Sequence, residues 1–140
     1  MAWTTHLLVI ANRTVDSEEL RDALVARAHA GPIEVTLLAP ATPDPGGDGE
    51  ARAATARRLL DAVQNLRRAD VRVHGVLGDP DPMLALDEVW DPRRFDEVIV
   101  VTLPRRTSRW LAADLSRRVE RFTGARVTHV MAKGRQKATA

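Results

Sequence analysis

Residues 7–11 read Leu-Leu-Val-Ile-Ala, an unbroken apolar run that is followed directly by Asn12 and Arg13. A short run that is apolar at every position is typical of a strand buried on both faces of a sheet. Residues 98–101 read Val-Ile-Val-Val and form the most strongly apolar run of the chain. Together the two runs predict a parallel sheet that is covered on both sides.

Around these two runs, short apolar segments alternate with segments of helical periodicity. Three further strands are expected, at residues 33–39, 71–77 and 127–131. Helices are expected between the strands, at residues 16–30, 50–68, 82–90 and 108–123. The resulting β-α-β-α-β-α-β-α-β order predicts an α/β domain whose five-stranded, parallel, doubly wound open sheet carries helices on both faces.

Local signals indicate where several helices begin and end. Asp16 and Glu19 have the spacing of a capping box at the start of the first helix. Asp81 can cap the third helix, with Pro82 in its first position. Gly124 is placed to end the last helix.

The composition supports one folded domain and excludes several classes of protein. The chain has 140 residues, of which 44% are hydrophobic and 29% are charged, and it contains no cysteine. Disulfide frameworks, thiol catalysis and zinc ribbons are therefore excluded. No apolar stretch approaches the ~18 residues of a membrane span, and no signal peptide is visible. We expect a cytoplasmic domain over residues 1–132, without membrane insertion, and a basic, disordered tail over residues 133–140.

Positive charge is concentrated in the last part of the chain. The formal net charge is only +2, but the residues from Pro104 onward carry 10 basic and 2 acidic side chains. Such asymmetry often marks a surface that faces anions. The last predicted helix displays Arg117, Arg118 and Arg121, but aromatic side chains for stacking are missing from this face. The sequence therefore does not predict nucleic-acid binding.

Four segments carry a resemblance to a known family. Val76-Leu77-Gly78-Asp79-Pro80 is similar to the Val-x-x-Gly-x-Pro/Ala segment of the universal stress proteins. The strand at residues 96–101 and the helix and strand at residues 117–130 resemble theirs as well. Thr102-Leu103-Pro104, together with Ser108-Arg109-Trp110-Leu111, is similar to an actinobacterial branch of that family. The resemblance covers roughly residues 4–132.

The resemblance implies a strand order of 3-2-1-4-5 and a non-enzymatic regulatory or sensory domain in the stress response. It also implies a homodimer formed through the last strand, which contains Val127 and Val130. The alternative is a ligand-free dimerisation or protein-interaction module. Such a module could be related to a membrane transporter, since relatives in the actinobacterial branch are fused to permeases.

The chain departs from the ATP-binding members of the family at their glycine motif. Those members carry Gly-x2-Gly-x9-Gly-Ser/Thr after the fourth strand, where glycines let backbone amides approach the phosphates. Here no glycine occurs between Gly78 and Gly124. Asn12 also stands where those members usually carry an aspartate. The glycine motif of ATP binding is therefore not matched, and the sequence leaves the cofactor unassigned.

The candidate ligand site lies where the strand order reverses, between the first and fourth strands, because ligands of open α/β sheets bind beyond the carboxyl ends of the strands there. We expect a small anionic ligand or nucleotide at residues from three loops: Asn12, Arg13, Thr14, Gly78, Asp79, Thr102, Arg105, Arg106, Thr107, Ser108 and Arg109. The alternatives are a solvated loop with an ordinary serine cap and, for Gly78 and Asp79, a plain strand-to-helix turn.

No motif for catalysis or metal binding is visible. The chain has neither a Gly-x-Ser-x-Gly elbow nor a phosphate-binding lysine motif. Its four histidines, at positions 6, 29, 74 and 129, lie near four different element ends without metal-ligand spacing. The sequence therefore predicts surface histidines and no enzyme activity.

Overall fold

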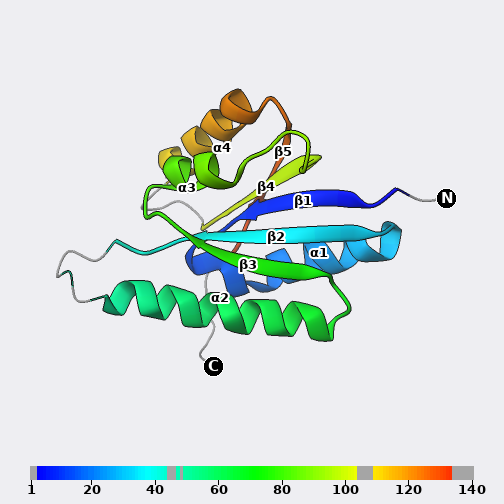
Figure 1. The fold of residues 1–140 in the computed structure, drawn as a ribbon, viewed down its shortest axis with the longest axis horizontal. Coiled ribbons are helices and arrows are strands. Elements are labelled where there is room, and N and C mark those ends of the chain that lie inside the picture. The colour runs from blue at the N-terminus through cyan, green and yellow to red at the C-terminus, as the bar shows by residue number, and fades with distance from the viewer. Residues whose placement is uncertain (1–2, 44–46, 48, 104–108, 134–140) are drawn as a thin grey trace.

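Five parallel strands form a single sheet in the order β3-β2-β1-β4-β5 (Figure 1). The structure, a computed structural model, describes residues 3–43, 47, 49–103 and 109–133, and for residues 109–113 it describes the backbone alone. The strands are β1 (Thr5–Ile10), β2 (Ile33–Pro40), β3 (Val73–Gly78), β4 (Glu97–Thr102) and β5 (Arg126–Met131). The expected sheet, its parallel pairing and its strand order are therefore confirmed.

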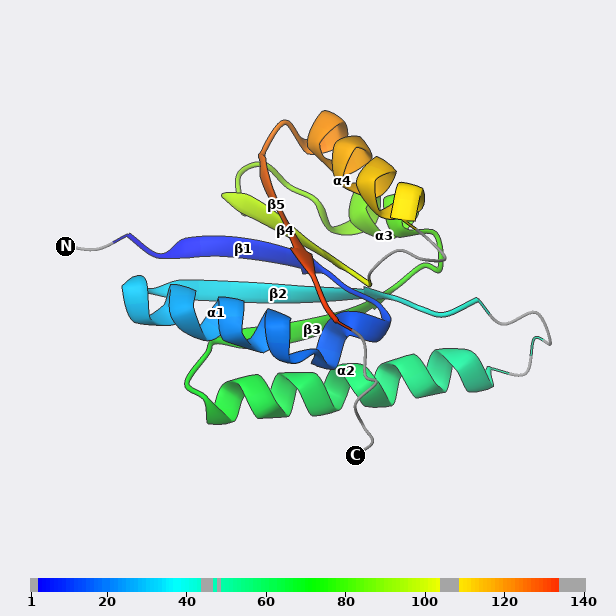
Figure 2. The ribbon, with the colours of Figure 1, turned by 180° about the vertical axis from the view of Figure 1, so that it is seen from behind.

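The helices cover the sheet in two layers. They are α1 (Glu18–Ala30), α2 (Glu50–Arg68), α3 (Pro82–Val89) and α4 (Arg109–Thr123), with a short 3-10 helix, η1 (Arg13–Asp16), after β1. Figures 1 and 2 show α1 and α2 on one face of the sheet, and α3 and α4 on the other. None of the described helices has the length and apolarity needed to cross a bilayer.

Each face of the sheet has its own hydrophobic core, because successive side chains of a strand point to opposite faces. Leu7 and Val9 of β1 pack with α1 and α2, together with Leu24 and Val63. The neighbouring side chains Leu8 and Ile10 belong to the core under α3 and α4. The continuous apolar runs in the sequence follow from this burial on both faces.

The first helix begins one residue later than the capping box predicts. Ser17, not Asp16, is the N-cap, and its hydroxyl accepts a hydrogen bond from the Leu20 amide at 3.2 Å. Asp16 closes η1 instead. That 3-10 turn is held by a long-range bond, in which the buried Thr14 hydroxyl donates to the Val101 carbonyl at 3.1 Å. The capping-box spacing predicts the wrong N-cap for α1, because a tertiary contact, and not local sequence, fixes the 3-10 turn that precedes the helix.

The structure confirms the predicted start of α3 and the predicted end of α4. Asp81 caps α3 by accepting from the Met83 amide at 2.9 Å, and Pro82 occupies the first turn. Gly124 follows α4 with a φ of 68°, a conformation that favours glycine. The predicted cap Ser108 and the tail at residues 134–140 lie outside the described residues.

Gly78 allows α3 to approach the sheet closely. A Cβ at this position would lie 2.7 Å from the Ala85 Cβ and 3.0 Å from the Leu38 Cδ1. Carbon atoms in contact are normally about 3.5–4.0 Å apart. The absence of a side chain at Gly78 therefore sets how near α3 lies to β2 and β3, and α3 begins with residues that border the pocket described next.

Candidate functional site

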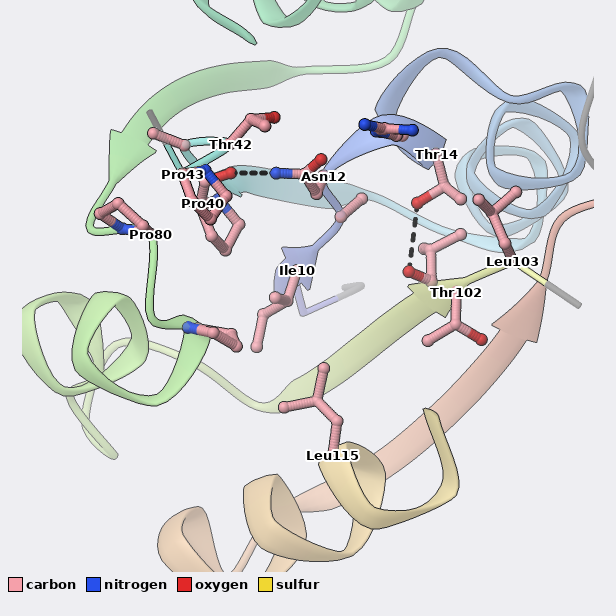
Figure 3. A pocket seen from close by; sticks show the side chains of 15 residues that line it. Ile10, Asn12, Thr14, Pro40, Thr42, Pro43, Pro80, Thr102, Leu103 and Leu115 are labelled. Carbon is pink, nitrogen blue, oxygen red and sulfur yellow. Dashed lines mark hydrogen bonds between the residues drawn. The ribbon is translucent and has the colours of Figure 1, made fainter. Parts of the chain in front are cut away.

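A pocket of about 370 Å³ opens at the carboxyl ends of β1, β2 and β4 (Figure 3). It lies at the point where the strand order reverses, which is where ligands of open α/β sheets bind. Figure 3 shows Leu115 of α4 on one side of it, and Pro40, Thr42 and Pro43 on the other. Its described lining consists of Ile10, Ala11, Asn12, Arg13, Thr14, Pro40, Ala41, Thr42, Pro43, Pro80, Pro82, Val101, Thr102, Leu103 and Leu115.

The walls of the pocket are mainly apolar. Ten of these fifteen residues are hydrophobic, and four of the ten are prolines, namely Pro40, Pro43, Pro80 and Pro82. Pro40 ends β2 and Pro43 follows it, whereas Pro80 lies between β3 and α3 and Pro82 begins α3. A small-molecule pocket commonly combines such apolar walls with a few polar groups that orient the ligand.

Two polar residues on the β1 side bind neighbouring strands. The Asn12 side-chain amide donates to the Pro40 carbonyl, which ties the end of β1 to the end of β2 (Figure 3). The Thr14 hydroxyl donates to the Val101 carbonyl of β4. Together these bonds hold η1 across the switch point and fix the floor of the pocket.

Two threonines on the other walls are also bonded within the protein. The amide of Thr42 donates to the buried Thr55 hydroxyl of α2 at 3.2 Å, and the two hydroxyl oxygens are 3.1 Å apart. The Thr102 hydroxyl lies 2.6 Å from Nε2 of His129 on β5. The segment after β2 is thereby anchored to α2, and the end of β4 to β5.

Arg13 differs from the other polar lining residues. Its side chain is exposed, and no hydrogen bond or ion pair joins its guanidinium to any described residue. It is also the one charged side chain in the described lining. Among the described lining residues, Arg13 is therefore the one that can form an ion pair with an anionic group.

The structure brings four of the predicted site residues together, since Asn12, Arg13, Thr14 and Thr102 all line the pocket. Gly78 and Asp79 do not belong to its lining. Gly78 packs against α3, and the Asp79 carboxylate accepts from the Asp81 amide at 2.9 Å. For these two residues the structure shows the strand-to-helix turn.

The predicted arginine loop is not tested by the structure. Arg105, Arg106, Thr107 and Ser108 lie outside the described residues, and Arg109 is described only as the first backbone position of α4. The convergence of the three arginines on one site therefore stays a prediction.

Sequence reasoning missed the walls contributed by β2 and by the start of α3. Pro40 ends β2 and Thr42 and Pro43 follow it, and β2 is the direct neighbour of β1, so the strand order could have indicated them. In the segment between β3 and α3, the sequence predicts Gly78 and Asp79 as site residues, whereas Pro80 and Pro82 line the pocket. Their position follows from the direction in which the chain leaves β3 to enter α3.

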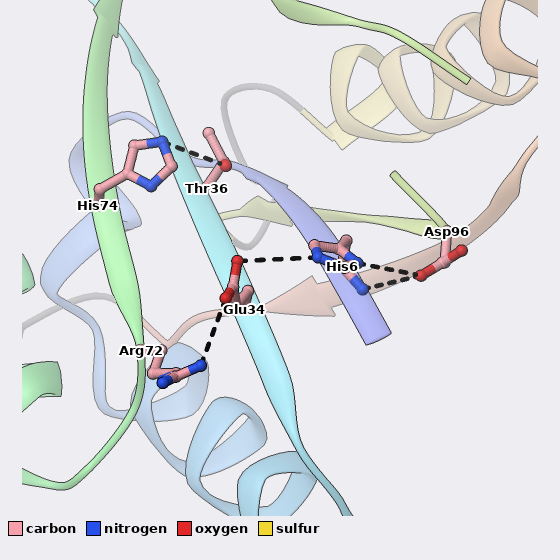
Figure 4. Close-up of polar contacts among 6 residues, drawn as sticks. All are labelled: His6, Glu34, Thr36, Arg72, His74 and Asp96. Atoms are coloured by element: carbon pink, nitrogen blue, oxygen red, sulfur yellow. Dashed lines mark hydrogen bonds and ion pairs between the residues drawn. The ribbon is translucent and has the colours of Figure 1, made fainter. Parts of the chain in front are cut away.

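The histidines do not form a shared site (Figure 4). His6 lies between two carboxylates, with Nε2 3.7 Å from Glu34 and Nδ1 3.7 Å from Asp96. His74 contacts Thr36 at 3.5 Å. Within the described part of the chain, no three histidine, aspartate or glutamate residues are grouped in a way that could hold a metal ion.

Fold and pocket together define the class, that of doubly wound parallel α/β domains with a ligand-sized pocket at the switch point. Among solved structures, the universal stress protein from Archaeoglobus fulgidus in complex with dAMP is similar to this chain, with a TM-score of 0.61 and 14% sequence identity. The match covers 93% of this chain and 99% of that one. The chain therefore has the universal stress protein fold.

A weaker structural match is the tetrameric eIF2B-beta2-delta2 complex from C. thermophilum, with a TM-score of 0.48 and 16% identity. It covers 92% of this chain and 38% of that one. No protein-family model and no curated protein sequence matches the chain.

Proposed function

We propose that this protein is a universal-stress-protein-like regulatory or sensory domain that binds a small anionic ligand or nucleotide in the crevice between β1 and β4. The observation that carries the proposal is the pocket of about 370 Å³ at the switch point, lined by Asn12, Arg13, Thr14 and Thr102. Its volume falls within the roughly 300–1,000 Å³ of small-molecule sites. A cytoplasmic role in the stress response belongs to the same proposal.

The structural relative adds support for a ligand of this size. The Archaeoglobus fulgidus protein is described in complex with dAMP, and it has the same fold over almost its whole length. The glycine motif of the ATP-binding members is missing here, as no glycine occurs between Gly78 and Gly124. Our proposal therefore does not include the family's mode of holding a triphosphate.

We propose binding without catalysis. The described pocket lining contains no carboxylate to act as a general acid or base or to hold a metal ion. The nearest arrangement to a nucleophile and its base is the contact between Thr102 and His129, for which no orienting third group is present among the described contacts. Binding is therefore the simpler use of this site.

The test is calorimetric titration of the full chain with dAMP, AMP, cyclic AMP and ATP, together with small organic anions. Pro43→Trp places a large ring at the exposed edge of the pocket and should abolish binding. Leu60→Trp is the matched control, because Leu60 lies on α2, 57% exposed and outside the lining. An Arg105→Ala/Arg106→Ala variant measures what the arginine loop contributes. Silence toward every compound would refute a ligand-binding function.

Strand β5 supports a second candidate function, dimerisation. It forms one end of the sheet, and β4 is its one strand partner in the described chain. Outer strands expose unpaired backbone groups that can pair with another chain. We propose a homodimer built on this strand, with Val127 and Val130 at its centre.

Sedimentation velocity at tens of micromolar tests the dimer. Met131→Lys adds a charge to the edge strand and should shift the protein toward monomer, since a symmetric interface brings like charges together. Leu84→Lys on α3 is the control, because Leu84 and Met131 are both 52% exposed. A monomeric wild-type protein would argue against this interface.

A further inference from the structure

We infer that the ligand of this pocket is a small, largely apolar molecule that bears a single anionic group, such as an arylalkanoic acid, and that Arg13 binds that group. The inference rests on the proposed function and names the chemical class of its ligand. It follows from three properties of the described pocket lining, namely its apolar walls, its bonded polar groups and its one free guanidinium.

The apolar walls favour a ligand whose buried part is apolar. The pocket is lined by Pro40 and Pro43 at and after the end of β2, by Pro80 and Pro82 around the start of α3, and by Leu115 from α4 (Figure 3). These side chains offer a ligand carbon surface and no hydrogen-bonding atoms. Burying apolar area is favourable in proportion to its extent, whereas burying a polar group without a partner is costly. A ribose or a phosphate chain would place its polar groups against these apolar side chains without hydrogen-bond partners.

The polar lining residues are already bonded within the protein. Asn12, Thr14, Thr42 and Thr102 each form a side-chain hydrogen bond to another residue of the chain. A protein that binds a polyphosphate must replace its hydration water with several hydrogen-bond donors that are not already bonded within the protein. Among these four side chains, the second amide hydrogen of Asn12 is left over, and the Thr102 hydroxyl can also donate when Nε2 of His129 carries the hydrogen.

Backbone amides of the pocket walls are bonded too. The Ala11 amide donates to the Leu38 carbonyl at 3.1 Å, and the Ala41 amide to the Gly78 carbonyl at 3.0 Å. The Thr42 amide donates to Thr55. Glycine-rich phosphate cradles work through backbone amides that point at the ligand. At these three positions of the wall, the amides are instead part of the protein's own framework.

Arg13 remains as the anion-binding group. Arg13 belongs to the pocket lining, its side chain is exposed, and its guanidinium has no partner in the described chain. Two parallel N–H donors of arginine match the two oxygens of one carboxylate. One free cation among the described lining residues of an apolar pocket of about 370 Å³ suits a ring of ordinary size that carries one carboxylate.

The experiment is calorimetric titration of the full chain with phenylacetate and 3-phenylpropionate, with phenylacetamide as a neutral analogue, and with dAMP and ATP. We expect the carboxylates to bind at least tenfold more tightly than the amide and than ATP. Arg13→Gln should reduce carboxylate affinity to the level of the amide and leave the amide unchanged. Arg93→Gln, at a side chain 91% exposed and outside the lining, should change neither.

The outcomes separate this inference from the proposed function. If dAMP or ATP binds and the carboxylates do not, the inference is overturned and the proposed function stands. Equal affinity for phenylacetate and phenylacetamide, or carboxylate binding that survives Arg13→Gln, also overturns it. Silence toward all five compounds overturns the proposed function together with the inference.

Discussion

Replacing Gly78 with alanine tests whether the contact between α3 and the sheet is as tight as the structure shows. The new Cβ would lie 2.7 Å from the Ala85 Cβ, about 1 Å closer than carbon atoms normally approach. Gly78 is not among the residues with positive φ, so its backbone accepts alanine. The whole cost therefore comes from overpacking, which is about 1–3 kcal/mol in a buried site. For a domain of this size, that corresponds to a Tm lowered by about 4–12 °C.

Urea and thermal denaturation measure the change in the free energy of unfolding. Gly31→Ala is the matched control, since nothing lies within 4 Å of a Cβ there and the φ of 172° is extended backbone. We expect its stability to change by less than about 0.5 kcal/mol. Adding Ala85→Gly to Gly78→Ala removes the clashing methyl group and should recover part of the loss. If Gly78→Ala is as stable as the wild type, the argument from close approach is wrong.

Three further substitutions test other contacts by denaturation. Thr55→Val keeps the buried volume but leaves the Thr42 amide without its acceptor, so a loss of about 1–3 kcal/mol is expected. Arg27→Gln breaks the half-buried 2.8 Å ion pair with Glu97 and should lower stability by about 1–2 kcal/mol, between the values of exposed and buried pairs. Phe95→Ala removes a buried ring from the core under α3 and α4, with an expected loss of about 3–5 kcal/mol. A change under about 0.5 kcal/mol in any of the three would contradict the contact in question.

The strands were predictable because a strand that is buried on both faces of the sheet is apolar at successive positions of the sequence. The runs at residues 7–11 and 98–101 are apolar at each position, and both fall in strands that pack against helices on two sides. Right-handed crossovers then restrict the topology. The start of α1 was not predictable in the same way, because Asp16 and Ser17 are both good capping residues. A bond between Thr14 and Val101, 87 positions apart, decides between them.

The candidate site was predictable only where it depends on strand order. Asn12 follows β1 and Thr102 ends β4, so the switch-point rule places them at the pocket. Pro43 and Pro80 line the pocket because of the paths that the chain takes after β2 and β3. Loop paths cannot be predicted from hydrophobic periodicity, because loops have none. The hydrogen bonds that occupy Asn12 and Thr102 could not be foreseen either, since their partners Pro40 and His129 come from other strands.

The internal hydrogen bonds of the polar lining residues affect the rate of ligand binding and the size of the conformational change that accompanies it. A pocket held open by the protein's own hydrogen bonds exists before any ligand arrives, so binding carries no cost for ordering the site. Stopped-flow association should then show a single phase whose rate rises linearly with ligand concentration. Such a domain changes shape little on binding. A partner would recognise the occupied state from the surface that the bound ligand adds to the pocket.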